Sequence, residues 1–298
     1  MVMKHFILWK MPLSLRWKRV MCSKPAKYTT SINTDFSSYA MSGVQSINQH
    51  QYKNLNIRFR EKTEDEKVLA DSFDNDIFYQ ELPYLKVSDK PVIVDVGAHI
   101  GTFSMFSSMK YPASKIFAFE ASRDTFSLLD TNVRENKLIP QVKVFHNALC
   151  SIDQPVTLYH NLVDGNWGHT ISKEISASSE VVDGLAFSTF VSKEQIREID
   201  LIKFNCEGAE FDILINSPDT LLAKIKCAVI LYHEDLAPSS YTTQQLVNKL
   251  AGAGLVSVFL NQSPNRGWII AVNRKYYFPF FFKLCLRLRQ KFRAWKKQ

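Results

Sequence analysis

The chain has 298 residues, a hydrophobic content of 46% and a formal net charge of +8. This length accommodates one large α/β domain with extensions. No stretch approaches the roughly 18 to 20 uncharged apolar residues that a membrane-spanning helix needs. The five cysteines are scattered without metal-ligand spacing, so we expect free thiols in a reducing, cytoplasmic compartment and no structural zinc.

Charge is distributed unevenly along the chain. Residues 1–34 contain seven Lys or Arg and residues 274–298 contain nine, and neither segment contains an acid. Subtracting both from the 37 basic residues leaves 21 in residues 35–273, against all 29 acidic residues, a net charge of −8. An acidic central region argues against a nucleic-acid substrate, which requires a basic cleft. The basic ends favour an anionic surface as a partner.

The two basic ends are treated as extensions. Residues 1–50 mix basic and apolar residues with a Ser/Thr-rich stretch, which predicts a surface extension; a targeting leader is the alternative. Residues 276–298 place apolar and aromatic side chains on one helical face and Lys or Arg on the others. Such a basic amphipathic helix either lies on an anionic membrane surface or docks on the sheet, and both alternatives stay open.

Residues 51–275 show alternating strand and helix patterns. A strand over 55–59 and a capping box that starts a helix at Thr63 open this region. Further strands are expected over 92–95, 115–120, 141–147, 155–159, 201–205 and 227–232, and helices over 102–109, 122–137, 192–197, 208–216 and 241–252. The runs 256–260 and 268–272 are typical of a hairpin, which predicts one antiparallel edge strand. The fold class predicted is α/β, with a doubly wound, mostly parallel seven-stranded sheet.

A glycine-containing loop follows the first of these buried strands. The segment 95–101 reads Asp-Val-Gly-Ala-His-Ile-Gly and leads directly into a helix. Glycines let the backbone approach a ligand, and the N-terminus of the helix presents unpaired N–H groups. The next strand ends in Glu120, where a carboxylate can accept hydrogen bonds from ribose hydroxyls. The pattern predicts a nucleoside site at the carboxyl edge of the sheet.

The loop favours a nucleoside that carries no phosphate. A pyrophosphate requires Gly-x-Gly-x-x-Gly, and His99 stands at the second glycine of that pattern. Asp95 at the mouth of the loop would repel phosphate but suits a cationic ligand. S-adenosylmethionine carries an ammonium and a sulfonium, so it is the predicted cofactor. A nicotinamide oxidoreductase and a plain strand-to-helix turn are the alternatives.

The segment 201–210, Leu-Ile-Lys-Phe-Asn-Cys-Glu-Gly-Ala-Glu, supplies a second set of polar side chains. If its strand ends near Asn205, then Asn205 and Glu207 emerge at the same sheet edge as Glu120. Glu210 would lie in the first turn of the following helix, where it either stabilises the helix dipole or contributes to the site.

Together with Phe-Glu-Ala-Ser at 119–122 and Asn-Ala-Leu at 147–149, these segments resemble the FkbM-type methyltransferases over about residues 52–273. That family comprises class I, S-adenosylmethionine-dependent enzymes that generally O-methylate sugars and other hydroxylated metabolites. The resemblance implies a set of cofactor contacts: Asp95, Gly97, His99 and Gly101 at the methionine end, Glu120 at the ribose, Asn147 and Ala148 at the adenine, and Ser122 and Asn205 beside them.

Two positions depart from the family pattern. Asn205 stands where the family usually has Asp, and Leu231 stands near a position that often holds Glu. An amide takes up no proton at neutral pH and is a weaker ligand than a carboxylate for hard cations. We therefore predict no metal site. The alternative to an O-methyltransferase acting on a sugar, glycolipid or other small metabolite is a catalytically impaired nucleoside-binding or scaffold protein.

Three residues are candidates for a general base. Methyl transfer depends mostly on holding the acceptor oxygen in line with the methyl group, and a base assists a hydroxyl acceptor. His233, at the carboxyl end of a strand, is the first candidate and Glu207 is the second. His169 is the third, in a loop where Trp167 could stack on a sugar. For each histidine, a packed or exposed structural imidazole is the alternative.

Overall fold

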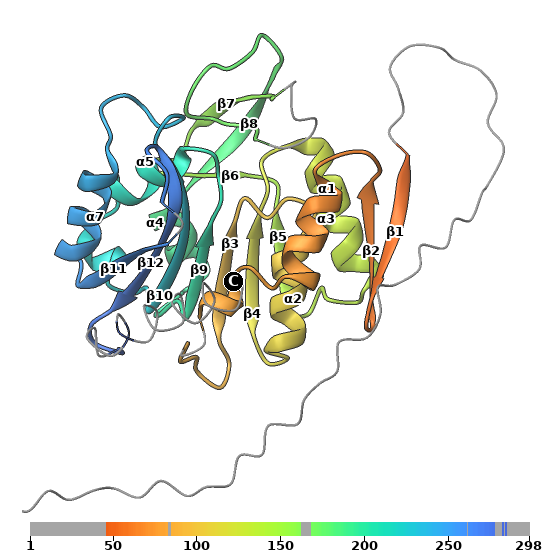
Figure 1. Cartoon of the computed structure of the whole chain (residues 1–298), viewed down its shortest axis with the longest axis horizontal. Helices are drawn as coiled ribbons and strands as arrows, with labels where there is room; N and C mark the ends of the chain where they lie inside the picture. The colour runs from red at the N-terminus through yellow and green to blue at the C-terminus, as the bar shows by residue number, and fades with distance from the viewer. Residues whose placement is uncertain are drawn as a thin grey trace, which may run out of the picture. The chain divides into compact units, whose positions relative to one another are not determined.

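The computed structural model describes residues 46–82, 85–161, 168–260 and 262–277, together with Phe282 and Leu284. All of them belong to the second of two compact units, Ala40–Gln298. The main sheet consists of β3 (Val92–Val96), β4 (Lys115–Phe119), β5 (Val142–Phe145), β9 (Leu201–Phe204), β10 (Cys227–His233), β11 (Leu255–Leu260) and β12 (Arg266–Asn273). Within the described residues the strand order is β11-β12-β10-β9-β3-β4-β5 (Figure 1).

Neighbouring strands from β10 across to β5 are parallel. The strand β12 is antiparallel to both β10 and β11, so the antiparallel strand lies one position inside the edge. The sequence-based placement of that strand at the edge is wrong. The physical reason is burial: Ile269 to Val272 of β12 are fully buried, as in an interior strand, whereas most of β11 is only half-buried.

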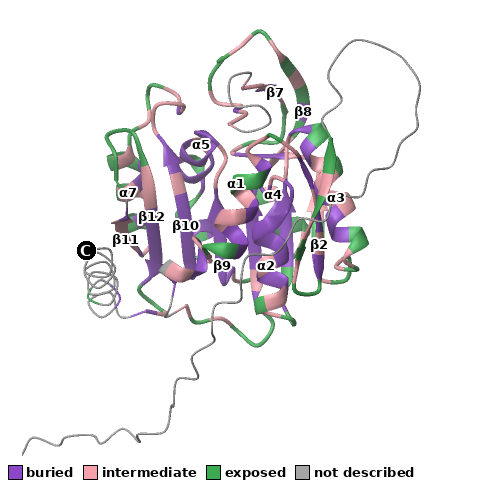
Figure 2. Ribbon diagram, turned by 45° about the vertical axis from the view of Figure 1, so that its right-hand side comes forward, coloured by how far each residue is buried: buried purple, intermediate pink, exposed green. Residues whose placement is uncertain are grey.

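Helices cover both faces of the sheet, which confirms the predicted doubly wound α/β class. One face packs against α2 (Thr102–Lys110) and α3 (Arg123–Glu135) through a core that includes Phe103 and Leu129. The other packs against α4 (Phe187–Lys193), α5 (Ala209–Asn216) and α7 (Thr243–Gly252) through a core that includes Phe211. The short α6 (Asp219–Leu222) adds Leu222 to that second core. Figure 2 shows the buried strands between these helices.

Two helix predictions need correction. The helix expected over 192–197 is α4, which starts earlier because Phe187 and Phe190 are buried in the core. The capping box expected at Thr63 does not form. The Thr63 hydroxyl accepts from the N–H of Asp65 and not from that of Glu66, as the box would require. The helix there is α1 (Asp65–Leu69), which continues into the π-helical turn η1 (Ala70–Asp74).

Several short strands were not predicted. One is β1 (Ile47–Tyr52), which starts inside the segment assigned to the N-terminal extension and forms a hairpin with β2 (Leu55–Arg60), the strand expected over 55–59. The strand β2 is tied to α3, because the Asn132 Oδ1 accepts from the N–H of Arg58 at 2.7 Å. A separate three-stranded sheet contains β6 (Ala148–Cys150), β7 (Pro155–Tyr159) and β8 (Ser179–Ala186), of which only β7 was expected.

The predicted extensions fall mostly outside the described residues. This applies to residues 1–45, to Trp167 and to all of 276–298 apart from Tyr276, Tyr277, Phe282 and Leu284. The proposed contact with an anionic membrane therefore stays a prediction. Across the described part of the chain, every helix falls short of the length and apolarity of a bilayer-spanning segment.

Candidate functional site

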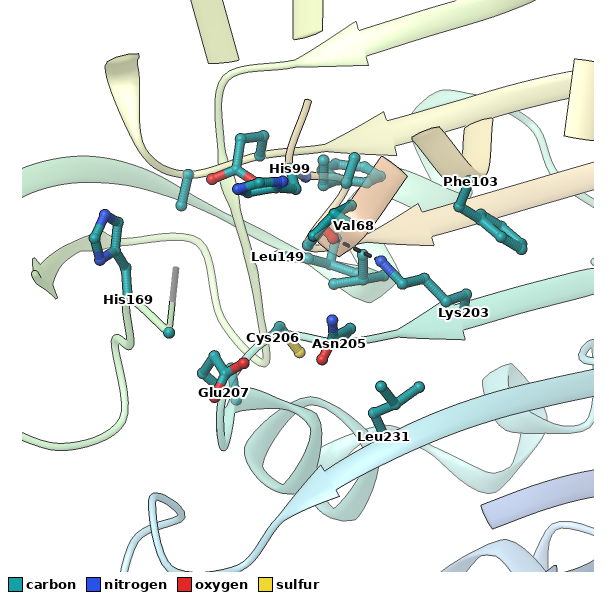
Figure 3. A pocket seen from close by; sticks show the side chains of 18 of the residues that line it. Val68, His99, Phe103, Leu149, His169, Lys203, Asn205, Cys206, Glu207 and Leu231 are labelled. Carbon is teal, nitrogen blue, oxygen red and sulfur yellow. Dashed lines mark hydrogen bonds between the residues drawn. The ribbon is translucent and has the colours of Figure 1, made fainter. Parts of the chain in front are cut away.

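A cavity of about 300 Å³ opens where β3, β4 and β9 end, a volume at the lower end of the range for small-molecule sites. Its floor is made by the loops that follow these strands, and α1 and η1 form another wall through Val68, Asp71 and Ser72. Leu231 of β10 and Trp268 of β12 line the cavity on the side of the antiparallel strand. Figure 3 shows how Glu207, His169 and Lys203 surround this space.

The glycine loop is packed tightly against the loop that follows β9. Gly97 has a φ of +74°, and a Cβ added there would lie 2.0 Å from the Asn205 carbonyl oxygen. The N–H groups of Gly97 and Ala98 both donate to the Phe119 carbonyl oxygen. Only a glycine combines this backbone conformation with so close an approach, so Gly97 brings the β3 and β9 ends of the cavity together.

The Glu120 carboxylate is positioned by the backbone. Its Oε2 accepts from the N–H of His99 at 2.8 Å, and its Oε1 accepts from the N–H of Ser122 at 3.0 Å. Burial raises the pKa of Glu120, and these two hydrogen bonds offset only part of that rise. Glu120 lines the cavity as predicted. Ser122 is buried outside the cavity, and its main-chain N–H helps to position the Glu120 carboxylate.

Asp95 does not lie at the mouth of the loop, contrary to the sequence-based expectation. Its side chain is fully buried and outside the cavity wall, with Oδ1 2.9 Å from the Lys203 Nζ and Oδ2 accepting from Ser104 at 2.7 Å. Lys203 also donates to the Gly97 carbonyl oxygen at 2.6 Å. The Asp95 charge is therefore balanced inside the protein and fixes the glycine loop through Lys203.

Lys203 is a cavity residue that no sequence motif indicated. It lines the cavity, with its Nζ 5.7 Å from the ring centre of Phe78 and 6.0 Å from that of Phe103. The sequence feature that could have revealed it is a lysine inside an apolar strand, because a buried ammonium group requires an acidic side chain nearby. In the sheet register Lys203 lies directly opposite Asp95.

His99 connects the glycine loop to α1. Its Nε2 lies 3.2 Å from the Asp65 Oδ1, and Asp65 forms a buried ion pair with Arg60 at 2.8 Å. His99 lines the cavity (Figure 3), and its main-chain N–H donates to Glu120. Gly101 does not line it: this residue has a φ of +91° at the start of α2, and a Cβ there would meet Leu129 of α3 at 2.7 Å. Gly101 therefore lets two helices pack closely.

The remaining predicted contacts, Asn147, Ala148 and Asn205, all line the cavity. Asn147 donates from its Nδ2 to the Asp183 carbonyl oxygen at 3.1 Å, which fixes its orientation. The Asn205 Oδ1 is buried and has no hydrogen-bond partner among the residues that the structure describes. A buried acceptor without a partner carries a free-energy cost, so this oxygen is suited to a donor from a bound ligand.

The general-base candidates are placed differently from their predicted order. Glu207 lines the cavity with 7% of its surface exposed. His233 does not line it; its ring lies 3.6 Å from Glu207 and 3.5 Å from Glu210 at a smaller neighbouring cleft. Burial lowers the pKa of His233, but the two carboxylates outweigh this and raise it overall. His233 lies outside the cavity, so it is less well placed than Glu207 to act as the base.

A family model described as the methyltransferase FkbM domain matches residues 95–254, which is more than half of the chain. The chain belongs to the FkbM methyltransferase domain family. The match begins at Asp95 and includes Glu120, Asn205 and Glu207, so the FkbM domain supplies most of the cavity floor.

Individual relatives agree with this family. Over 145 residues the chain is 30% identical to Methyltransferase 1 of Beauveria bassiana, covering 42% of this chain and 58% of the relative. Over 153 residues it is 28% identical to Methyltransferase sdnD of Sordaria araneosa, and the match covers 42% of this chain and 59% of that relative. The chain thus spans less than two thirds of the length of these relatives. Among solved structures, the methyltransferase FkbM from Methylobacillus flagellatus has 14% identity and a TM-score of 0.46, covering 64% of this chain and 45% of that one.

His169 of the FkbM domain lines the cavity as a neutral hydrogen-bond donor. Its Nδ1 accepts from the N–H of Asn161 at 3.0 Å, so the neutral ring carries its proton on Nε2. Burial, aided by the nearby His160, lowers the pKa of His169 to about 4. The ring's only lone pair is occupied, so His169 is arranged to donate a hydrogen bond and not to accept a proton.

We expect the His169 ring to titrate with a midpoint near 4 in a pH series of ¹⁵N-histidine NMR spectra. Between its usual pKa of 6.5 and about 4, the unfolded chain binds a proton that the folded chain does not. The free energy of unfolding should therefore fall as the pH falls through this window, and less steeply in His169→Asn. A midpoint near 6.5 would contradict the buried, acceptor-engaged ring.

Proposed function

We propose that this cavity binds S-adenosylmethionine and that the protein transfers the methyl group to a hydroxyl oxygen of a small acceptor. The observation that carries the proposal is the Glu120 carboxylate, held by two backbone N–H groups at the end of β4 and lining the cavity. A carboxylate so placed can accept hydrogen bonds from a ribose diol.

The side chains of the cavity suit a nucleoside that carries positive charge. Glu120 and Glu207 contribute carboxylates, and the Asn205 Oδ1 is a buried acceptor. The charge of Lys203 is balanced by Asp95, which leaves it a poor partner for a pyrophosphate. Glu120 would hold the ribose and Asn205 the ammonium group. This set of groups supports a methyl donor over a dinucleotide.

Bound S-adenosylmethionine would supply a methyl group activated by its sulfonium sulfur. The protein's part is to hold the acceptor and to remove its proton. Glu207 lines the cavity and is the carboxylate that we assign as the general base. The apolar surfaces of Leu231 and Trp268, also on the cavity wall, would exclude water and pack on the acceptor, including the apolar face of a sugar ring.

Replacing Glu120 with alanine is expected to weaken binding of S-adenosylmethionine about a hundredfold, because two hydrogen bonds to a charged group are lost. Isothermal titration calorimetry on the purified chain measures this directly. Glu135→Ala, which removes a surface carboxylate of α3 paired with Arg58, serves as the matched control and should leave the affinity unchanged. Equal affinities for wild type and Glu120→Ala would contradict the proposed ribose contact.

The acceptor class is tested by transfer of a labelled methyl group to sugar, glycolipid and other hydroxylated compounds. Binding of the cofactor without transfer to any of them would favour the second candidate, a nucleoside-binding protein without catalysis. Asn205 and Leu231 are the observations that favour it, because both positions lack a carboxylate and both line the cavity.

A further inference from the structure

Glu207, His233 and Glu210 form a continuous buried set of charges, here called the Glu–His–Glu array. The His233 Nε2 lies 3.6 Å from the Glu207 Oε2, and the His233 Nδ1 lies 3.5 Å from the Glu210 Oε1. All three residues are less than a tenth exposed. Glu207 forms the cavity end of the array, and His233 faces the smaller cleft on its other side.

Glu210 is the fixed end of the array. Its Oε1 accepts from the N–H of His233 at 2.7 Å, and its Oε2 accepts from the N–H of Gly208 at 3.0 Å. These bonds join the start of α5 to the end of β10. Because Glu210 is fully buried and hydrogen-bonded to two backbone groups, its carboxylate is fixed in place, and it faces the His233 ring as an ion-pair partner.

The His233 ring faces two carboxylates, whereas one would suffice to balance the charge of an imidazolium. Across the small cleft, Arg266 of β12 forms an ion pair with Asp235 at 2.8 Å, so its charge is largely balanced there. The array would then hold a cation between two anions. Glu210 fixes the main chain of His233 at the end of β10, and the Glu207 oxygen is the second anion within 4 Å of the ring, on the side of the cavity.

We propose that His233, fixed by Glu210, is a positioning residue that keeps the Glu207 carboxylate ionised and directed to the cavity, where Glu207 takes the proton of the methyl acceptor. This inference rests on the proposed function. In the transfer, the acceptor O–H proton moves to a Glu207 oxygen. The acceptor oxygen bonds to the methyl carbon as the C–S bond breaks, and the electron pair of that bond stays on sulfur. His233 keeps its proton throughout.

The array is tested first without cofactor, by ¹⁵N-histidine NMR titration of the full chain. The His233 midpoint should lie above 6.5 and should fall by about one pH unit in Glu207→Gln, since a carboxylate within 4 Å favours the charged ring. Glu180→Gln, whose carboxylate lies 3.2 Å from His160, is the control and should leave the His233 midpoint unchanged. A His233 midpoint that does not move in Glu207→Gln would overturn the proposal.

The second test is a double-mutant cycle on methyl transfer, with methyl α-glucopyranoside, cyclohexanol and phenol as probe acceptors. His233→Gln should lower kcat about tenfold without weakening S-adenosylmethionine binding, and should add no further loss in a Glu207→Gln background. It should also move the acidic limb of the pH profile to higher pH, because Glu207 loses its cationic neighbour. His50→Gln on β1 lies outside both cavities and should retain full activity.

Additive losses for Glu207→Gln and His233→Gln would overturn the positioning role. Absence of S-adenosylmethionine binding by the wild type would instead contradict the proposed function. If the wild type binds the cofactor but methylates no probe, the assignment of a hydroxyl acceptor of these classes fails. In both of the latter cases the NMR titration still decides whether the array exists as described.

Discussion

Gly97→Ala is expected to lower the free energy of unfolding by about 3 kcal/mol or more and to abolish cofactor binding. A left-handed backbone costs about 1–2 kcal/mol for a residue with a Cβ, and Gly97 has a φ of +74°. The new Cβ would also lie 2.0 Å from the Asn205 carbonyl oxygen, which only a backbone shift relieves. That shift would separate the two loops that form the cavity floor.

Urea unfolding followed by circular dichroism measures this effect, and calorimetry measures the binding. Gly254→Ala is the matched control, because Gly254 has a φ of +87° but no atom within 4 Å of an added Cβ. It should show the conformational cost alone, about 1 kcal/mol, with normal cofactor affinity. Equal destabilisation in the two variants would show that the contact with Asn205 contributes nothing.

The second large effect is expected at the buried ion pair. Lys203→Met should destabilise the protein by about 3–5 kcal/mol, because it leaves the fully buried Asp95 carboxylate without its cation. Adding Asp95→Asn to Lys203→Met should restore most of the lost stability, since no uncompensated charge remains.

Urea unfolding of the two single variants and the double variant measures the coupling between Asp95 and Lys203. Lys115→Met is the control: this lysine pairs with Glu194 at 3.5 Å but its side chain is 56% exposed, so little change is expected. A Lys203→Met protein as stable as the control would show that Asp95 does not depend on Lys203 for its charge balance.

Most of the sheet could be predicted from the sequence, because buried strands and intervening helices have distinct apolar periods. The position of β12 could not, since strand order depends on which apolar strand is buried on both faces. The strand over 55–59 was predicted as β2, but its pairing with β1 and its attachment to α3 were not: the side chain of Asn132 on α3 binds the main chain of Arg58. No local pattern encodes such a partner.

The site was predicted at the level of loops and less well at the level of side chains. The ends of β3, β4 and β9 do form the cavity, and Glu120, Asn205 and Glu207 line it as expected. Asp95 is buried outside the cavity wall, because a motif gives the loop's place in the sheet but not the direction of each side chain. Its true partner, Lys203, is set by strand register.

The base candidates are placed differently from their predicted order for a related reason. His233 stands at the carboxyl end of β10, as the sequence predicted, but the neighbouring turn directs Glu210 and Glu207 to its ring. Their charges raise the pKa of the His233 ring, and the ring lies outside the cavity, so Glu207 is the better-placed candidate for the base. A residue's place at a sheet edge therefore predicts proximity to the site, while its protonation depends on the side chains packed around it.

The central claim is that the cavity accepts a phosphate-free nucleoside through the Glu120 carboxylate. Calorimetric titration of the wild-type chain with S-adenosylhomocysteine, and separately with NAD, measures this without any assumption about the acceptor. We predict saturable binding of S-adenosylhomocysteine at one site per chain and no binding of NAD. No heat of binding for S-adenosylhomocysteine, or tighter binding of NAD, would contradict the account.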